Sequence, residues 1–298
     1  MPTDSKTYSN LTSRNLDKLY FEKLTEKPSQ AARVTKKETM QFSDYIEGDF
    51  AGMGYLQESY EGASFILDEL HQGRTKTIYP TTRSLGFEYT EEALADDRYG
   101  IISKYPAELG ASVAATDELI GFLPLNQAFA GPITTLDGQY LCSNTHADIF
   151  YGTTQDNLVS GALSAATLQE GLLLANNVKT SEGRPAIKRA KYLVVAANSN
   201  NYFLGKDLVK NEWMYNSNDR NLNPFMGEGL VLLPVDWLTT NTNWFLLSED
   251  HDMRMFTRME TKLRKGTDPR NGNYFMYAKS RKTADVFNWQ GVVGSVGA

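Results

Sequence analysis

Apolar residues recur at helical spacing in several stretches of the chain, and these stretches predict its helices. The longest pattern begins at Pro106, which suits the first turn of a helix, and runs through Leu109 and Val113 to about Pro124. A second helix is expected after Ser164, an N-cap residue, with Leu168, Leu172, Ala175 and Val178 on one face. Further helices are expected near residues 15–26, from Thr90 onward and near residues 200–210.

Short apolar or alternating runs predict strands in the second half of the chain. Buried strands are expected at residues 192–195, 230–234 and 244–247. A strand meander is expected at 256–263, 274–279 and 284–293, with a turn at 266–272 that contains Asp-Pro and Asn-Gly. Because a linker rich in Gly, Pro and Thr near residues 130–139 precedes a change to alternating helices and strands, a second domain is expected to begin there.

An isolated hairpin is predicted in the first third of the chain. Ser64 to Leu70 and Thr75 to Tyr79 read as its two strands, and His71 to Arg74 as its turn. An isolated two-stranded hairpin is only marginally stable, so this one packs on its own domain or on another subunit, and the sequence does not choose. The polar segment before Tyr45 is either a poorly ordered terminus or an arm that orders against a neighbour.

Composition and charge narrow the possible functions. The chain carries 30 Lys and Arg against 36 Asp and Glu, a formal net charge of -6, which gives no general electrostatic reason to bind phosphate backbones. Sequence-specific DNA binding is therefore not expected. Cys142 is the only cysteine, so an intrachain disulfide and a cysteine-based zinc cluster are excluded. No run approaches the roughly 18 apolar residues of a membrane span, and no secretory signal is apparent, so neither insertion nor secretion is expected.

Motifs that carry chemistry are weak throughout. The three histidines, His71, His146 and His251, show no zinc-binding spacing, and the acidic loop 249–252 reads as a solvated turn. Cys142 lies near His146, but a single cysteine beside an apolar strand is usually inert and buried. We therefore expect no catalytic, cofactor-binding or metal-binding residues and no enzymatic activity.

Four sequence blocks resemble, in order, the major capsid proteins of tailed bacteriophages of the Hong Kong 97 type, and the Mu-type major head subunits especially. They are LGFEYTEEALADDRYGIISKYPAELGASVAATDELI from Leu85, LDGQYLCSNTH from Leu136, GALSAATLQEGLLLANN from Gly161 and RPAIKRAKYLVVAAN from Arg184. Each block alone is weakly specific, whereas four in series are specific. The resemblance covers roughly residues 45–298.

The resemblance implies an α+β fold, the Hong Kong 97-type capsid fold, and assigns the segments to its parts. The expected parts are an N-terminal arm at 1–45, an E-loop region at 46–89, a peripheral domain with a long spine helix at 90–129 and 253–298, and an axial α/β domain at 130–252. On this mapping the predicted hairpin becomes the extended E-loop, which lies over a neighbouring subunit.

The function implied is that of a structural head protein, which assembles as hexamers and pentamers into an icosahedral shell around double-stranded DNA. Expected partners are further copies of the chain, a separate scaffolding protein, a portal protein and decoration proteins, with assembly in the host bacterial cytoplasm and location in the virion. For contacts between subunits we expect the cations Arg74, Lys76 and Arg83 to meet acidic residues of a neighbour such as Glu91, Asp96 and Asp97, although each could equally be a solvated charge. The alternatives are an encapsulin-like nanocompartment shell and, in another class, a soluble α/β enzyme.

Overall fold

The computed structural model describes residues 16–64, 67, 71–90, 92–93, 96–98, 100–102, 104–147, 154–213 and 221–297. The chain forms two compact units, each built from three separate segments. The first unit comprises Met1–Asp44, Tyr79–Gly121 and Met255–Ala284, and the second comprises Tyr45–Ile78, Phe122–Arg254 and Asp285–Ala298. Each unit is described by itself below.

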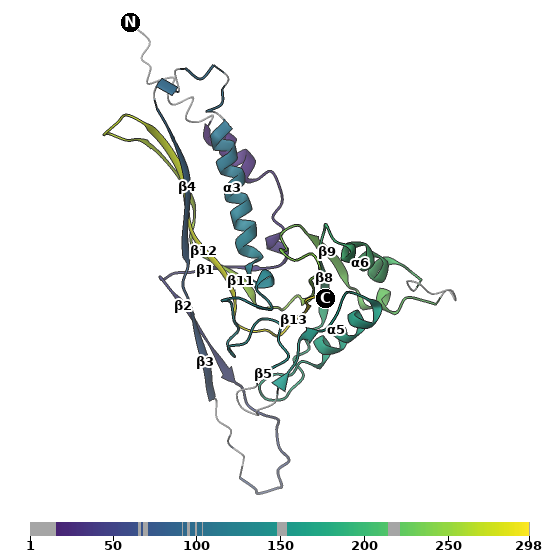
Figure 1. Cartoon of the computed structure of the whole chain (residues 1–298). Coiled ribbons are helices and arrows are strands. Elements are labelled where there is room, and N and C mark those ends of the chain that lie inside the picture. The colour runs from purple at the N-terminus through teal and green to yellow at the C-terminus, as the bar shows by residue number, and fades with distance from the viewer. Residues whose placement is uncertain are drawn as a thin grey trace. The chain divides into compact units, whose positions relative to one another are not determined.

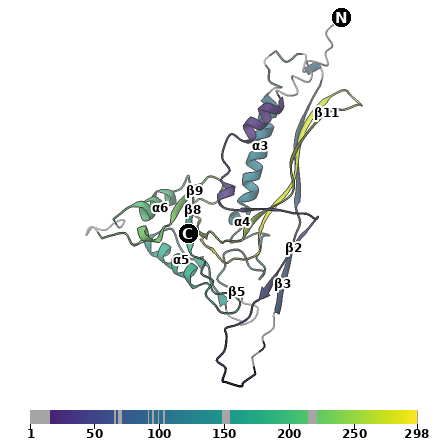
Figure 2. The ribbon, with the colours of Figure 1, turned by 180° about the vertical axis from the view of Figure 1, so that it is seen from behind.

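The first unit is a four-stranded sheet with a long helix along one face. The sheet has the order β1 (Lys36–Thr39), β11 (Met253–Thr267), β12 (Tyr274–Val286) and β4 (Thr81–Tyr89). Strands β12 and β4 are antiparallel and pair from Tyr274 opposite Tyr89 to Lys282 opposite Thr81. Helix α3 (Lys104–Gly121) runs along the sheet in both views (Figures 1 and 2). The turn between β11 and β12 holds Gly272 at φ 74°, a conformation that favours glycine.

Helix α3 packs between the sheet and a shorter helix at residues 16–24. Leu109 and Val113 of α3 meet Met276 and Ala278 of β12, and Tyr20 joins them at 1% exposure. Gly110 permits the close approach of the two helices, because a Cβ there would lie 2.4 Å from the carbonyl oxygen of Tyr20. The Glu118 carboxylate then accepts hydrogen bonds from the amides of Gln30 and Ala31, at the start of η1 (Ala31–Arg33).

The second unit is built on a five-stranded sheet with helices on one face. The order is β7 (Leu158–Val159), β13 (Val292–Ser295), β10 (Trp244–Ser248), β8 (Ala190–Ala196) and β9 (Val231–Val235). The pairs β13–β7 and β8–β9 are parallel, whereas β10 is antiparallel to both β13 and β8. Two short sheets, β2 (Tyr45–Ala51) with β3 (His71–Ile78) and β5 (His146–Ala147) with β6 (Thr154–Gln155), belong to the same unit.

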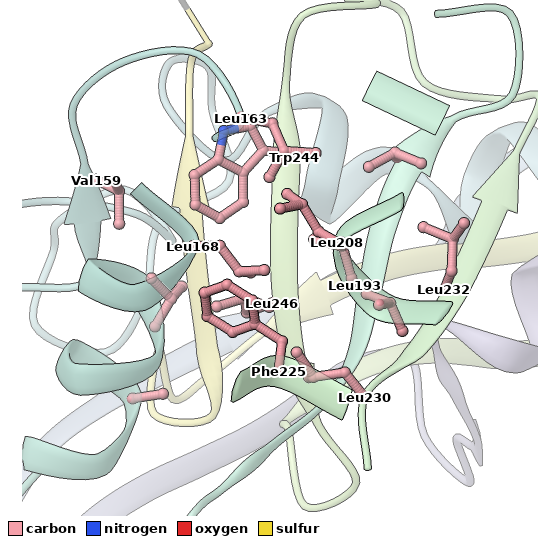
Figure 3. Packing of buried hydrophobic residues seen from close by; sticks show 14 residues of the cluster. Val159, Leu163, Leu168, Leu193, Leu208, Phe225, Leu230, Leu232, Trp244 and Leu246 are labelled. Carbon is pink, nitrogen blue, oxygen red and sulfur yellow. The ribbon is translucent and has the colours of Figure 1, made fainter. Parts of the chain in front are cut away.

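Helices α5 (Ala165–Asn177) and α6 (Asn200–Lys210) bury the sheet face that carries Trp244, Leu246 and Leu193 (Figure 3). Ser164 begins α5 with a capping box, because its hydroxyl accepts from the Thr167 amide while the Thr167 hydroxyl accepts from the Ser164 amide. The remaining elements are α4 (Leu123–Asn126) and η2 (Pro224–Glu228). Phe129 stacks on Phe245 from the other face of the sheet, at 5.5 Å between ring centroids, so both faces are covered.

Most predicted helices and strands are confirmed. The helix from the region of Pro106, the helix after Ser164 and the helix at 200–210 are present, as are the strands near 192–195, 230–234 and 244–247. Residues 16–24 are helical, as are residues 92–93, where the Thr90 hydroxyl accepts a hydrogen bond from the Ala93 amide. Among the described residues no helix is long and apolar enough to cross a membrane.

Two expectations are corrected by strand pairing. The predicted second strand is present, but β3 begins at His71, where a turn was expected, and its partner is β2. Most of the predicted first strand, residues 65–66 and 68–70, lies outside the described residues. The alternation of polar and apolar residues predicted the second strand. Its partner β2 ends about twenty positions earlier in the sequence, and the sequence rules for tight turns do not apply over that separation.

The second correction concerns the end of the chain. The segment 253–298 was expected wholly in one domain, yet β13 pairs with β10 in the sheet of the second unit, where Val292 and Val293 are 1% and 2% exposed. A strand with two buried apolar residues fits either sheet equally well, so the sequence pattern alone could not assign β13 to one of them. Likewise β4, expected within the 46–89 region, pairs with β12 in the first unit.

Candidate assembly surfaces

The hairpin β2–β3 and the loop that follows β2 carry an unusual density of exposed apolar side chains. Exposure reaches 66% at Tyr55, 87% at Tyr60 and 102% at Leu56. Ile46, Phe50, Met53 and Leu67 are also largely exposed. Residues 45–70 contain six carboxylates and no Lys or Arg. Clustered apolar surface of this kind marks an interaction site, and its acidic character favours a basic partner.

Two cations anchor the base of this hairpin within its own unit. The Lys76 ammonium on β3 donates to the Asp285 carboxylate and to the carbonyl oxygens of Thr134 and Val286, and the Lys76 side chain is only 18% exposed. The Arg254 guanidinium binds both carboxylate oxygens of Glu47 on β2, at 2.7 and 3.1 Å. Each strand of the hairpin is therefore fixed by one ion pair.

Phe287 joins the two anchors. Its ring centroid lies 5.7 Å from the Lys76 ammonium and 5.5 Å from the Arg254 guanidinium, which is within cation–π range. Tyr45 contacts the same ring at 5.8 Å between centroids. We call Lys76, Asp285, Glu47, Arg254 and Phe287 the hairpin anchor.

Partial burial and ion pairing both shift the pKa values of the charged groups at the hairpin anchor. Burial lowers the pKa of Arg254, but the hydrogen bonds that its guanidinium donates to Glu47 and the charge of Asp252 outweigh burial and raise the pKa above its usual range. The pKa of Asp252 is raised, first by burial and also by the nearby charge of Glu47, and these two causes outweigh its pairing with Arg254. Arg254 thus holds two carboxylates together as a permanent cation.

A second surface of opposite charge lies on the first unit. Leu263, Met276 and Ala278 face α3, and successive side chains of a strand point to opposite faces. The far face therefore carries the exposed cations that alternate with them on β11 and β12, namely Arg258, Lys262, Arg264 and Lys279. Tyr277 lies on this face too. The Glu260 carboxylate instead reaches the Lys282 ammonium at 3.0 Å, and Lys282 is on the side of the sheet toward α3, where it binds Asp117. We call this surface the basic sheet face.

The residues predicted for contacts between subunits lie in different places. Arg74 and Lys76 are on β3 of the second unit, and both are partly buried. Arg83 is on β4 of the first unit and donates to the carbonyl oxygen of Lys282 at 2.7 Å. These three cations do not form one cluster, and Lys76 has its ion pair within the subunit.

The predicted acidic partners lie just before α3. Asp96 is exposed, whereas the Asp97 carboxylate accepts hydrogen bonds from the amides of Ile101 and Ile102, both at 2.9 Å. Glu91 lies outside the described residues. The sequence analysis did not identify Glu47, Arg254, Asp285 and Phe287, because the side-chain contacts that involve them span long separations, 207 positions for Glu47 with Arg254 and 209 for Lys76 with Asp285.

The residues considered for chemistry give no reactive site. Cys142 is buried, and burial raises the pKa of its thiol far above the ordinary value, so the expectation of an inert cysteine is confirmed. Glu249 of the acidic loop pairs with Lys191, and Asp252 pairs with Arg254. Within the described ranges, no three His, Cys, Asp or Glu side chains form a group that could hold a metal ion.

Comparisons with known proteins agree with this architecture. The model of the family described as "Phage capsid protein" matches residues 74–295. No curated protein sequence matches the chain significantly.

Several solved structures share the fold at low identity. The mature capsid of bacteriophage PhiM1 matches with a TM-score of 0.59 at 11% identity, over 90% of this chain and 87% of that one. The capsid of bacteriophage JBD30, decorated with minor capsid protein trimers, matches at 0.58 and 15% identity, over 72% and 92%. A virus-like particle from Pyrococcus furiosus matches at 0.55 and 8% identity, over 95% and 98%. These likenesses establish the Hong Kong 97-type fold.

Proposed function

The chain belongs to the phage capsid protein family, and from that premise we propose that it builds an icosahedral head shell as hexamers and pentamers of itself around double-stranded DNA. It is a structural capsid protein of the virion. The observation that carries the assembly proposal is the exposed apolar loop after β2, whose side chains have no core of their own to enter. A second copy of the chain provides the surface that covers them.

We propose that this loop lies on the basic sheet face of a neighbouring copy. The loop brings carboxylates such as Glu58 and Glu61, both exposed, and the basic sheet face offers Lys262 and Arg264. Opposite charges across an interface steer encounter and fix register, while the apolar side chains supply the area that an obligate interface needs, about 2,000 Å² or more. Tyr60 and Tyr277 are the aromatic side chains suited to its centre.

This proposal keeps only some of the charge pairs between subunits that the sequence predicted. Arg74 and Arg83 remain proposed contacts to acidic residues of a neighbour, with Asp96 and Glu91 as partners. Lys76 and Asp97 instead have partners within their own subunit, so we propose that they act by holding the hairpin and the start of α3 in place.

The wider set of partners is also a proposal. A separate scaffolding protein, a portal protein and decoration proteins are expected to meet the shell, and assembly is expected in the host cytoplasm. DNA would be enclosed without sequence-specific binding, consistent with the net charge of -6. No catalytic step, cofactor or metal enters this account.

A nanocompartment shell stays the second candidate, since a shared fold, which extends to a virus-like particle from Pyrococcus furiosus, does not decide what a shell encloses. The contents of purified particles distinguish the two. Nuclease-protected DNA in particles from infected or induced host cells supports the phage head, and a co-purifying cargo enzyme supports the compartment. A uniform small oligomer with ligand-dependent activity would instead favour the soluble enzyme class.

A charge-reversal experiment tests the interface. Electron microscopy of the expressed chain, with scaffolding candidates coexpressed if required, should show shells, tubes or sheets. Lys262→Glu with Arg264→Glu should abolish them, and adding Glu58→Lys with Glu61→Lys should restore them. Lys206→Glu, an exposed charge on α6, is the matched control and should assemble normally. Normal assembly of the first double variant would overturn the proposed docking.

A further inference from the structure

Two residues that lie near His146 in the sequence, Asp137 and Asn157, and one that is distant, Trp289, meet at its buried imidazole. His146 is 1% exposed. Its Nδ1 lies 2.6 Å from Asp137 Oδ2, and its Nε2 lies 3.1 Å from Asn157 Oδ1. The ring stacks on Trp289, with centroids 4.4 Å apart and planes at 10°. No part of the shell-building account uses this cluster.

The orientation of the Asn157 amide fixes one ring proton. Its Nδ2 donates to the carbonyl oxygens of Leu141 and Val292, at 2.8 and 2.9 Å, so Nδ2 cannot be the atom that faces the ring. Its Oδ1 also accepts from the Ser143 amide at 2.8 Å. Since Oδ1 can only accept, the Nε2 that faces it must carry a hydrogen.

The Asp137 carboxyl group fixes the other ring proton. Its Oδ1 accepts from the Gln139 amide at 3.0 Å and from the Thr135 hydroxyl, and its Oδ2 faces His146 Nδ1. Burial raises the pKa of Asp137, but the hydrogen bonds from His146 and Thr135 outweigh burial and hold the pKa below its ordinary value. The shared proton therefore belongs on Nδ1, opposite a carboxylate.

We propose that His146 is held as an imidazolium at neutral pH and that, with Asp137 and Asn157, it forms a clasp that opens as pH rises. Trp289 fits this state, because the face of an indole ring favours a cation. The cavity in front of the ring has a volume of about 270 Å³, and its other charged lining groups are Asp49, Lys179 and Glu182. Glu182 is itself paired with Arg184 at 3.3 Å, so this lining adds little net charge, and the contacts to Asp137 and Asn157 carry the assignment.

The direction of the pH effect follows from the hydrogen-bond roles. With both ring protons present, both contacts are hydrogen bonds. After one is lost, a bare nitrogen faces either an amide oxygen or a carboxylate, and a buried polar pair without its hydrogen is costly. The clasp links the loop at 137–147 and Asn157 to Val292 of β13, so the last strand of the sheet should loosen at alkaline pH.

A second buried histidine provides an internal reference. His251 is 5% exposed, and its Nδ1 accepts a hydrogen bond from the Met253 amide at 3.3 Å. A nitrogen that accepts carries no proton, so this ring is neutral. The chain thus holds two buried histidines for which the geometry assigns opposite charge states.

Solid-state nitrogen NMR of assembled protein labelled with ¹⁵N-histidine tests the assignment. His146→Gln identifies the signals of His146 by their loss. At neutral pH both ring nitrogens of His146 should be protonated, whereas His251 should show one protonated and one bare nitrogen. A single protonated nitrogen on His146 at neutral pH would overturn the proposal. Because the spectrum reports on one ring, it is independent of how subunits dock.

Thermal unfolding provides a second readout. As the pH is raised above neutrality, the Tm of the wild-type chain should fall, because the clasp loses one of its two ring protons. Asp137→Asn removes the carboxylate that retains the proton, so its Tm should fall by less than half as much. His251→Gln should keep the full wild-type fall. Equal falls in the wild type and Asp137→Asn would contradict the clasp.

Discussion

The five-stranded sheet and the hairpin β2–β3 belong to the same compact unit but are stabilised by different means. The sheet buries Trp244, Leu246 and Leu193 at 1% exposure or less, whereas Ile46 and Phe50 of the hairpin are each 63% exposed. The sheet is complete without a partner. The hairpin depends on ion pairs at its base and leaves its apolar side chains outward. This difference separates residues that fold the subunit from residues that we propose connect it to others.

The largest expected effect is on the sheet. Trp244→Ala removes the largest fully buried side chain and should cost about 3–5 kcal/mol of unfolding free energy, close to the total stability of many domains. Denaturant unfolding followed by circular dichroism measures it. Trp213→Ala, at a position 48% exposed, is the matched control and should cost far less. Similar losses of unfolding free energy in both variants would mean that burial in the sheet does not determine the cost of removing a tryptophan.

The next effect is on the hairpin anchor. Arg254→Gln leaves Glu47 and Asp252 without their cation, and the partial exposure of these groups reduces the expected cost to about 1–3 kcal/mol. Hydrogen exchange should accelerate in β2 and β3 by tenfold or more and stay unchanged in β10. Uniform acceleration in both regions would show that the anchor supports the whole unit.

Substitutions in the loop should affect assembly but not folding. Leu56→Ser and Tyr60→Ser remove exposed apolar surface, so unfolding free energy should change by less than about 0.5 kcal/mol. Sedimentation should nevertheless show fewer assembled particles. A destabilised monomer with normal assembly would reverse the roles assigned to sheet and loop.

A small, pH-dependent effect on stability is expected at Asp252. Burial raises its pKa, so its contribution to stability is present at low pH and is lost as pH rises through the folded-state value. Asp252→Asn should therefore change stability by less than about 1 kcal/mol at neutral pH. The wild type should gain stability relative to the variant as the pH falls through the raised folded-state value toward about 4, and the gain should be complete below that pH. A relative loss on acidification would contradict the assigned sign.

How far the sequence predicts this molecule depends on whether a feature is local. Helix α5 follows from Ser164 and the apolar positions after it, because a cap and a 3.6-residue repeat are written within one segment. The turn before Gly272 follows from Asn-Gly for the same reason.

Features that depend on long-range pairing could not be predicted. The partner of β3 lies beyond a long loop, and β13 reads equally well as a strand of either sheet. The clasp required Asp137, His146 and Asn157 to be seen together, and only the Cys142–His146 neighbourhood drew attention in the sequence. Lys76 was identified as important, but its partner Asp285 is 209 positions away.

The docking of the loop on the basic sheet face of a neighbour is tested most directly by cysteine trapping. Cys142 is buried, so new surface cysteines at Glu58→Cys and Lys262→Cys are the only accessible thiols in a double variant. Oxidised assemblies should give a ladder of disulfide-linked oligomers on non-reducing gels, and each single variant should give no ladder. Assembled particles that yield only uncrosslinked chains, with both thiols still reactive toward a small reagent, would contradict the account.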